Sequence, residues 1–333
     1  MSNMTAIIKA EGLTKVYQSS TKAVDGISFA VERGETFGFL GPNGAGKTTT
    51  IKMLTTLSTI TAGRATVADR DVSKDPSGVR RVIGMVPQEL TADDELKGIE
   101  NLRLTAKLHH VPEAETRKKA PELLKLVDLE DAAERRVRSY SGGMRRRLQL
   151  AMGLIHTPEV LFLDEPTLGL DIQTRRTMWD YLKRLNQDDG LTVFMTTHYL
   201  EEADLLCDRV AIIDHGVIKV IDTPARMKQA LGGDVLTIGV NDGADLSAFF
   251  AGIPDVYEVS RSGEVYKMKL PKPESALPTI VDGITRRGLK ITEISFTKPS
   301  LDEVFLEVVG KTMRDEEEGG ESWIANVNRE RMR

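Results

Sequence analysis

The sequence predicts an α/β protein whose main domain is built on a parallel β-sheet, with a small α+β domain behind it. Short apolar runs alternate with helical segments between residues 36 and 200, which is typical of parallel strands covered by helices. One of these runs leads into a glycine-rich loop and a helix. After residue 233 the expected elements follow the order β-α-β-β-α-β, which indicates a second domain.

The first part of the chain reads as short strands, which we expect to form an antiparallel β subdomain beside the main sheet. The expected strands are residues 7–10, 16–17 and 27–31, and a turn at Arg33 and Gly34 follows them. The ring of Tyr17 can stack on a purine base. From the local sequence alone, an ordinary strand tyrosine is the more common case.

A glycine-rich loop lies between the strand at residues 37–40 and a helix that we expect from Thr50 onward. It matches the pattern G-x-x-x-x-G-K-[ST] and consists of Gly41, Pro42, Asn43, Gly44, Ala45, Gly46, Lys47, Thr48 and Thr49. The glycines allow backbone N–H groups to close around a phosphate chain, and the helix N-terminus adds a partial positive charge. Lys47 can reach the outer phosphates, and the Thr48 hydroxyl can bind Mg²⁺. The alternative is a glycine turn before a core helix, but the full match favours a nucleoside triphosphate site in a P-loop NTPase core.

Three further apolar strands end in polar residues. Residues 82–86 lead to Gln88, residues 160–163 lead to Asp164 and Glu165, and residues 192–197 lead to His198. Ligands bind just beyond the carboxyl ends of the strands in open parallel sheets, so we expect these side chains to meet the glycine-rich loop in one crevice.

Each of these side chains has a chemical role available to it there. Asp164 can hold Mg²⁺, and Glu165 can polarise an attacking water. Gln88 can bind the metal or orient that water, and His198 can donate a hydrogen bond to the γ-phosphate. The alternatives are a plain turn at residues 164–166 and a helix cap at His198.

Residues 89–158 are helical and charged, and we expect them to form a helical insertion in the main domain, with helices at residues 97–110, at residues 113–127 and after residue 141. Ser141 is a good N-cap, and Gly142 and Gly143 expose backbone N–H groups at a helix start, which makes a second anion site. The three arginines at residues 145–147 are predicted to lie on a solvated face with one or two salt bridges rather than to grip nucleic acid.

Thr223 and Pro224 begin a helix that Gly232 and Gly233 end, so we place a domain boundary there. The main domain is then residues 5–232, the second domain residues 234–310, and a charged, flexible tail residues 311–333. The expected elements of the second domain are strand 235–240, helix 245–252, strands 256–261 and 265–270, helix 275–287 and strand 290–297, in ferredoxin-like order. A further helix from Leu301 has one apolar face, which either closes its own core or contacts another subunit.

Composition excludes several classes of function. The chain of 333 residues has 45 basic and 50 acidic groups and a net charge of −5, which argues against nucleic-acid binding as the main function but leaves room for a local basic patch. Cys207 is the single cysteine, so no intramolecular disulfide forms, and we expect its side chain to be a small buried hydrophobe. No signal peptide and no run of about 18 apolar residues is seen, so we expect no transmembrane segment.

These motifs together resemble the ATP-binding cassette (ABC) family over roughly residues 5–232. The glycine-rich loop matches its Walker A motif, and residues 160–164 with Glu165 match its Walker B motif and catalytic glutamate. Gln88 matches the Q-loop, residues 168–171 match the D-loop, and His198 matches the H-loop.

The resemblance adds three assignments to this reading. Ser141, Gly142 and Gly143 match the signature sequence of the family. Tyr17 falls where the family places the aromatic residue that stacks on adenine, and Asp171 is the acidic residue of the D-loop. We therefore count these residues among the expected nucleotide-binding groups.

Two departures from the family pattern surround the signature. Tyr140 and Met144 stand where the consensus has Leu and Gln. We expect the anion contact of Ser141 to be retained. With Met144 in place of glutamine, a side-chain amide contact to the nucleotide is lost, and the sequence does not fix the resulting hydrolysis rate. The stretch from Tyr140 to Arg147 resembles separate ATP-binding subunits of the daunorubicin-resistance type, whose partners are ABC-2 type permeases.

The resemblance implies a head-to-tail homodimer with two Mg-ATP at its interface, in which Ser141 and Gly143 of one chain bind the γ-phosphate held by Lys47 of the other. ATP hydrolysis would drive a separate ABC-2 type membrane permease that exports a drug-like or lipophilic compound. The ATPase would lie at the cytoplasmic face of the membrane, and no nucleic-acid partner is expected. The alternative is a soluble ABC ATPase acting on nucleic acid or ribosomes without a permease, which would favour two cassettes in one chain or a long coiled coil. A P-loop kinase or GTPase would leave the signature site without a purpose.

Overall fold

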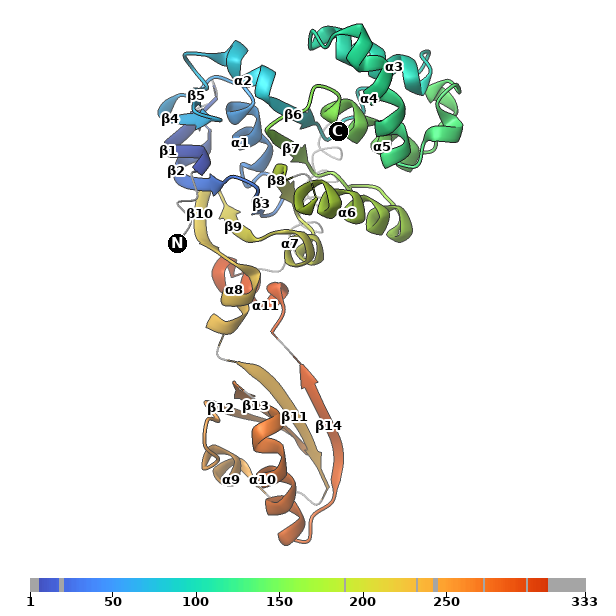
Figure 1. The fold of residues 1–333 in the computed structure, drawn as a ribbon. Helices are drawn as coiled ribbons and strands as arrows, with labels where there is room; N and C mark the ends of the chain where they lie inside the picture. Colours follow the sequence, from blue (N-terminus) through green and yellow to red (C-terminus); the bar gives the residue numbers. More distant parts are fainter. Residues whose placement is uncertain are drawn as a thin grey trace, which may run out of the picture. The chain divides into compact units, whose positions relative to one another are not determined.

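The computed structural model describes residues 6–17, 21–188, 190–231, 233–241, 245–271, 273–297 and 299–310. These residues form two compact units, the first ending at Asp222 and the second starting at Thr223 (Figure 1). The second unit therefore starts one helix earlier than the sequence suggests. Gly232 and the expected tail at residues 311–333 lie outside the described residues.

The first unit is built on a six-stranded sheet with the order β10-β9-β3-β8-β7-β6 (Figure 1). Its strands are β3 (Thr36–Leu40), β6 (Ile83–Val86), β7 (Val160–Asp164), β8 (Thr192–Thr197), β9 (Arg209–Asp214) and β10 (Val217–Asp222). All neighbours are parallel except β10, which pairs antiparallel with β9 at the edge. Strands β3, β7 and β8 are buried along their whole length, which explains their continuous apolar runs. The four strands that precede the expected site residues are thus direct neighbours.

A second, antiparallel sheet of the first unit has the order β2-β1-β4-β5. Its strands are β1 (Ala6–Val16), β2 (Lys22–Glu32), β4 (Ala62–Val67) and β5 (Arg70–Asp71). Strands β1 and β2 are longer than the sequence suggests. A register shift between Ala10 and Leu13 interrupts the alternation of apolar and polar residues, so the sequence pattern predicts only short strands there. Gly12 and Gly26 have positive φ angles of 57° and 65°, which glycine adopts without strain.

The expected helical insertion is confirmed. Its helices α3 (Gly98–Leu108), α4 (Glu113–Leu126) and α5 (Gly142–Leu154) pack on one another, with short 3₁₀ turns η1 (Glu130–Ala132) and η2 (Val137–Ser139) between α4 and α5. Tyr140 is buried, and its hydroxyl donates a hydrogen bond to the Ala132 carbonyl at 2.7 Å. Tyr140 therefore packs the insertion, which accounts for one departure from the family pattern.

The remaining helices of the first unit are α1 (Lys47–Leu54), α2 (Pro76–Val82), α6 (Ile172–Gln187) and α7 (Leu200–Leu206). Cys207 follows α7 and is buried, as predicted. Burial raises the pKa of its thiol well above the usual value, which makes it an unreactive group.

The second unit has the expected ferredoxin-like arrangement. Its elements are α8 (Pro224–Ala230), β11 (Asp234–Val240), α9 (Ser247–Ala251), β12 (Glu258–Ser262), β13 (Val265–Leu270), α10 (Pro273–Arg286), β14 (Ile291–Thr297) and α11 (Leu301–Val309). The sheet is antiparallel with the order β12-β13-β11-β14. Leu301, Val304 and Phe305 of α11 are buried, and α11 packs against α8 of the same unit. A helix that spans a bilayer needs about 20 mostly apolar residues, and none of the helices in the described part of the chain meets that requirement.

Candidate functional site

The glycine-rich loop joins β3 to α1, and α1 begins at Lys47 rather than at Thr50. Gly46 precedes the helix with a φ angle of 105°. A Cβ atom on Gly46 would lie 2.4 Å from the Ala23 carbonyl oxygen, and one on Gly41 would lie 2.2 Å from the Ile213 carbonyl oxygen. Only glycine fits at these two positions, so the tight loop over the helix N-terminus suits a phosphate group.

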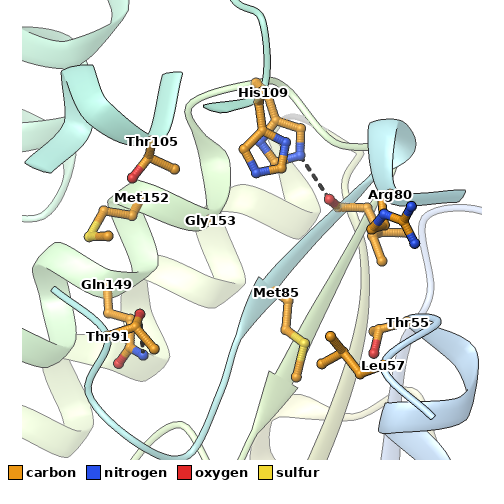
Figure 2. A pocket seen from close by; sticks show the side chains of 12 residues that line it. Thr55, Leu57, Arg80, Met85, Thr91, Thr105, His109, Gln149, Met152 and Gly153 are labelled. Carbon is orange, nitrogen blue, oxygen red and sulfur yellow. Dashed lines mark hydrogen bonds between the residues drawn. The ribbon is translucent and has the colours of Figure 1, made fainter. Parts of the chain in front are cut away.

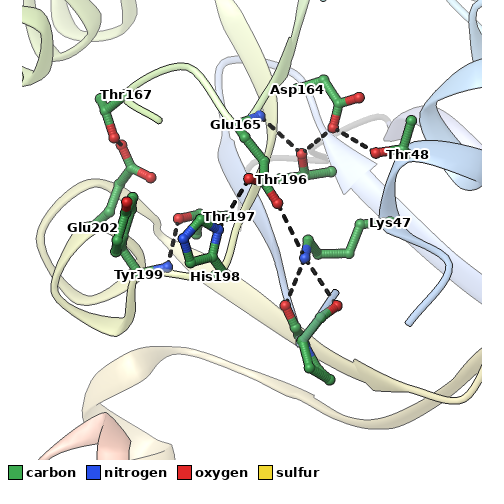
Figure 3. Close-up of polar contacts among 12 residues, drawn as sticks. Lys47, Thr48, Asp164, Glu165, Thr167, Thr196, Thr197, His198, Tyr199 and Glu202 are labelled. Atoms are coloured by element: carbon green, nitrogen blue, oxygen red, sulfur yellow. Dashed lines mark hydrogen bonds and ion pairs between the residues drawn. The ribbon is translucent and has the colours of Figure 1, made fainter. Parts of the chain in front are cut away.

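Lys47 is buried at the base of this loop, with 4% of its surface exposed. Its Nζ donates hydrogen bonds to the carbonyl oxygens of Gly41 (2.6 Å) and Pro42 (3.1 Å). The same Nζ forms an ion pair with Glu165 Oε1 at 3.2 Å (Figure 3). The ammonium group is therefore held at the junction of the loop and the end of β7.

Glu165 lies at the centre of the polar network in Figure 3. Its φ angle of 49° is uncommon for a residue with a side chain, and its N–H bonds to the Thr196 carbonyl oxygen (3.2 Å) and Oγ1 (3.1 Å) hold this conformation. His198 Nδ1 lies 3.0 Å from Glu165 Oε2. Burial alone raises the pKa of Glu165, but the His198 hydrogen bond and the charge of Lys47 together lower it below its usual value. Glu165 is therefore a carboxylate at neutral pH.

Asp164 is the second acidic residue at the end of β7. Its Oδ1 accepts hydrogen bonds from the hydroxyls of Thr48 (3.1 Å) and Thr196 (2.6 Å). Carboxylate and hydroxyl oxygens are hard ligands of the kind that small divalent cations take. Thr196 orients both acids, since it donates to Asp164 and accepts from the Glu165 N–H. The sequence predicts Thr196 only as part of a strand, and nothing in the strand pattern marks it as a residue that positions the two acids.

Gln88 and Tyr17 are less closely tied to this network. Gln88 is exposed, and its carbonyl oxygen, rather than its side-chain amide, accepts a hydrogen bond from Arg146. Tyr17 follows β1, is 42% exposed, and has Lys15 Nζ 5.2 Å from the centre of its ring. The exposed ring is accessible for stacking.

The serine–glycine turn forms the predicted helix start. Ser141 is the N-cap of α5, and its hydroxyl accepts the Met144 N–H at 3.3 Å. A Cβ atom on Gly143 would lie 2.6 Å from Thr174 Cγ2 of α6. Asp171 caps α6 and binds both the N–H and the hydroxyl of Thr174, at 3.0 and 2.6 Å. Asp171 thus orients the residue against which the turn packs.

The prediction for the arginines at residues 145–147 is wrong for Arg146. Arg145 forms the expected ion pair, with Asp94 at 2.9 Å, and Arg147 donates to the carbonyl oxygens of Val127 and Asp128. Arg146 is only 4% exposed and binds main-chain carbonyls of two distant loops. Charge runs suggest solvated faces, so the sequence carries no signal for this buried guanidinium.

A cavity of about 230 Å³ lies between the insertion and the main sheet (Figure 2). It is lined by Leu57, Met85 and Met152, and by the stacked rings of His109 and His156, whose centres are 3.8 Å apart. His156 Nε2 lies 2.7 Å from the Ile83 carbonyl oxygen. Burial, aided by the nearby His109 and Lys119, lowers the pKa of His156 to about 4.

This pKa predicts a loss of stability in acid. The unfolded chain, with an ordinary histidine pKa near 6.5, binds more protons than the folded chain between pH 6.5 and about 4, so stability decreases as pH falls through that window. We expect His156→Gln to remove on the order of 1 kcal/mol of the difference in unfolding free energy between pH 7.5 and pH 5. Urea unfolding at the two pH values measures it, and an identical pH dependence in the variant would contradict it.

Comparison with known proteins places this architecture in a family. Residues 24–168 match the model of the ABC transporter family, and residues 223–309 match that of the C-terminal domain of DrrA1-3-like ATP-binding proteins. The chain is 40% identical to the daunorubicin resistance ATP-binding protein DrrA3 of Streptomyces coeruleorubidus, over 93% of this chain and 98% of that protein. It is 36% identical to the linearmycin resistance ATP-binding protein LnrL of Bacillus subtilis, over 93% of this chain and 100% of that protein.

A solved structure supports the same relationship. A dimeric ATP-binding cassette in a post-hydrolysis state with ADP and Pi aligns with a TM-score of 0.60 and 27% identity, over 65% of this chain and 98% of that chain. The Walker motifs, the signature turn and the DrrA-like second domain are consistent with these likenesses. This chain therefore belongs to the ATP-binding cassette family, as an ATPase of the drug-resistance type.

Proposed function

We propose that two copies of this chain pair head to tail around two Mg-ATP and drive a separate ABC-2 type permease at the cytoplasmic face of the membrane. The likeness to drug-resistance ATP-binding proteins over most of the chain carries this proposal. Because those relatives are named for resistance to daunorubicin and to linearmycin, the proposed cargo is a drug-like or lipophilic compound. The names of these relatives do not favour action on nucleic acid or ribosomes.

In the proposed mechanism, the glycine-rich loop and Lys47 hold the β- and γ-phosphates, and Tyr17 stacks on the adenine. Thr48 and Asp164 supply oxygen ligands for Mg²⁺, and their 3.1 Å hydrogen bond keeps the two oxygens together. When bound, Mg²⁺ would neutralise charge on the phosphate oxygens. Thr196 fixes the orientation of Asp164.

Glu165 polarises the attacking water, a role worth about 10²–10⁴-fold in rate. Its lowered pKa keeps it ionised, and His198 fixes its carboxylate through Nδ1. We propose that His198 Nε2 donates to the γ-phosphate, and that the Gln88 side chain binds the metal or orients the water.

The signature turn completes the site in the proposed dimer. Ser141, Gly142 and Gly143 present backbone and hydroxyl donors at the start of α5, which suits an anion. In one chain the turn lies against Thr174 of α6. We propose that it binds the γ-phosphate held by the partner's P-loop, with Asp171 at the same interface.

Drug accumulation in the source cell tests the transport proposal. Deleting the gene should raise the intracellular level of fluorescent daunorubicin, and the intact chain should restore the lower level, whereas the Glu165→Gln chain should not. Flotation of membranes from the same cells should carry the tagged chain. A chain that never floats with membranes, together with unchanged drug accumulation, would support the soluble alternative instead.

A further inference from the structure

Arg146 is a buried guanidinium that connects two loops of the proposed site. Its Nη1 donates to the carbonyl oxygens of Pro87 (2.7 Å) and Gln88 (3.1 Å), which follow β6. On its other side, three carbonyl oxygens at the end of β7 accept its hydrogen bonds: those of Glu165 (2.6 Å), Pro166 (2.8 Å) and Asp164 (3.3 Å). One planar side chain therefore spans the backbone of the Gln88 loop and that of the acidic pair.

Gln149, one helical turn further along α5, also binds the backbone of the Gln88 loop. Its Nε2 donates to the Glu89 carbonyl oxygen at 2.7 Å and to Thr91 Oγ1 at 3.3 Å, and Figure 2 shows it beside Thr91. Its Oε1 accepts a hydrogen bond from Arg146 Nη1 at 3.0 Å. The two side chains thus hold the backbone on both sides of Gln88.

The chemistry of this position requires arginine. A guanidinium offers five N–H donors in a fixed plane, whereas a lysine ammonium offers three from a single point. Burial lowers the pKa of Arg146, while the carboxylates of Asp164, Glu165 and Glu202 oppose that change and stabilise its charge. Burying a charge is costly unless it is well bonded, so the carbonyl contacts offset a large desolvation penalty.

We propose that Arg146 is a positioning residue for ATP hydrolysis. Its guanidinium fixes the spacing between the Gln88 loop and Glu165 and ties both to α5, whose first turn is the signature. A movement of the insertion would then shift these two groups together. The inference rests on the proposed roles of Gln88 and Glu165.

The test is Arg146→Lys in the full chain, compared with Arg147→Lys as a matched control. Both residues lie in α5 and donate to main-chain carbonyls, but Arg147 binds Val127 and Asp128, away from the site. We expect Arg146→Lys to lower kcat by tenfold to about 10²-fold, which is the scale of a 1 Å misplacement. The KM for ATP should change less than threefold, because the P-loop contacts of Lys47 are untouched. Arg147→Lys should keep its kcat.

A second variant covers the case in which Arg146→Lys does not fold. Gln149→Met keeps the volume and the Arg146 charge but removes the contacts to Glu89 and Thr91, and we expect a smaller fall in kcat with unchanged KM. Equal kcat values for the Arg146 and Arg147 variants would overturn the proposal. So would a parallel loss of kcat, ATP affinity and melting temperature, which indicates general destabilisation. Intact turnover in Glu165→Gln would overturn the catalytic assignment of Glu165 and, with it, the proposal for Arg146, whereas equal kcat values for the Arg146 and Arg147 variants overturn the role of Arg146 alone.

Discussion

Replacing Glu165 by glutamine is expected to lower ATP turnover by about 10²–10⁴-fold while ATP binding is retained. Glutamine has the shape of glutamate but lacks the charge that polarises water. Glu165 is ionised at neutral pH because His198 and Lys47 lower its pKa, so the substitution removes a negative charge that is present in the working protein. Phosphate release at saturating Mg-ATP measures the turnover, and equilibrium titration with a fluorescent ATP analogue measures the affinity.

Glu201→Gln is the matched control for this change. Glu201 lies in the first turn of α7 and is exposed, so the control removes the same charge from the surface. We expect its turnover to equal that of the unchanged chain. Turnover in Glu165→Gln that matches the control would remove Glu165 from the proposed chemistry, and a lost affinity for ATP would assign it to binding instead.

The local parts of this architecture could be predicted from the sequence. Strands β6, β7 and β8 are apolar runs that lead to polar residues, β3 leads into the glycine-rich loop, and the rule for parallel sheets brings these strand ends together. The ion pair of Lys47 with Glu165 and the contact of Glu165 with His198 follow from that rule. The N-cap role of Ser141 follows from residue type alone.

Other features depend on contacts that the sequence pattern does not encode. Arg146 binds carbonyl oxygens at Pro87, 59 positions away, and at Pro166, 20 positions away. Every residue has a backbone carbonyl, so the partners of this guanidinium leave no trace in residue type. The full lengths of β1 and β2 could not be predicted either, because bulges break the alternation of apolar and polar residues that identifies a strand.

Placing a negative charge on the signature turn is expected to prevent the proposed ATP-induced dimer. Gly142→Asp in a Glu165→Gln chain should weaken ATP-dependent dimerisation by at least about 10²-fold, because like charges brought together at an interface cost several kcal/mol. ATP binding to the single chain should be retained, since Lys47 and the P-loop are unchanged. Size-exclusion chromatography with light scattering, with and without Mg-ATP, measures the dimer.

Gly142 is the suitable position for this test because a Cβ atom there would meet no other atom within 4 Å. An aspartate in the first turn of α5 also suits the helix dipole, so the fold should tolerate it. Gly142→Asn has nearly the same volume without the charge, and we expect it to weaken the dimer far less. If the two variants dimerise equally well with ATP, the turn does not face a phosphate in the dimer. If the turn instead bound the nucleotide of its own chain, the added charge would weaken ATP binding by the monomer. The affinity of the monomer for ATP would then fall in Gly142→Asp but not in Gly142→Asn.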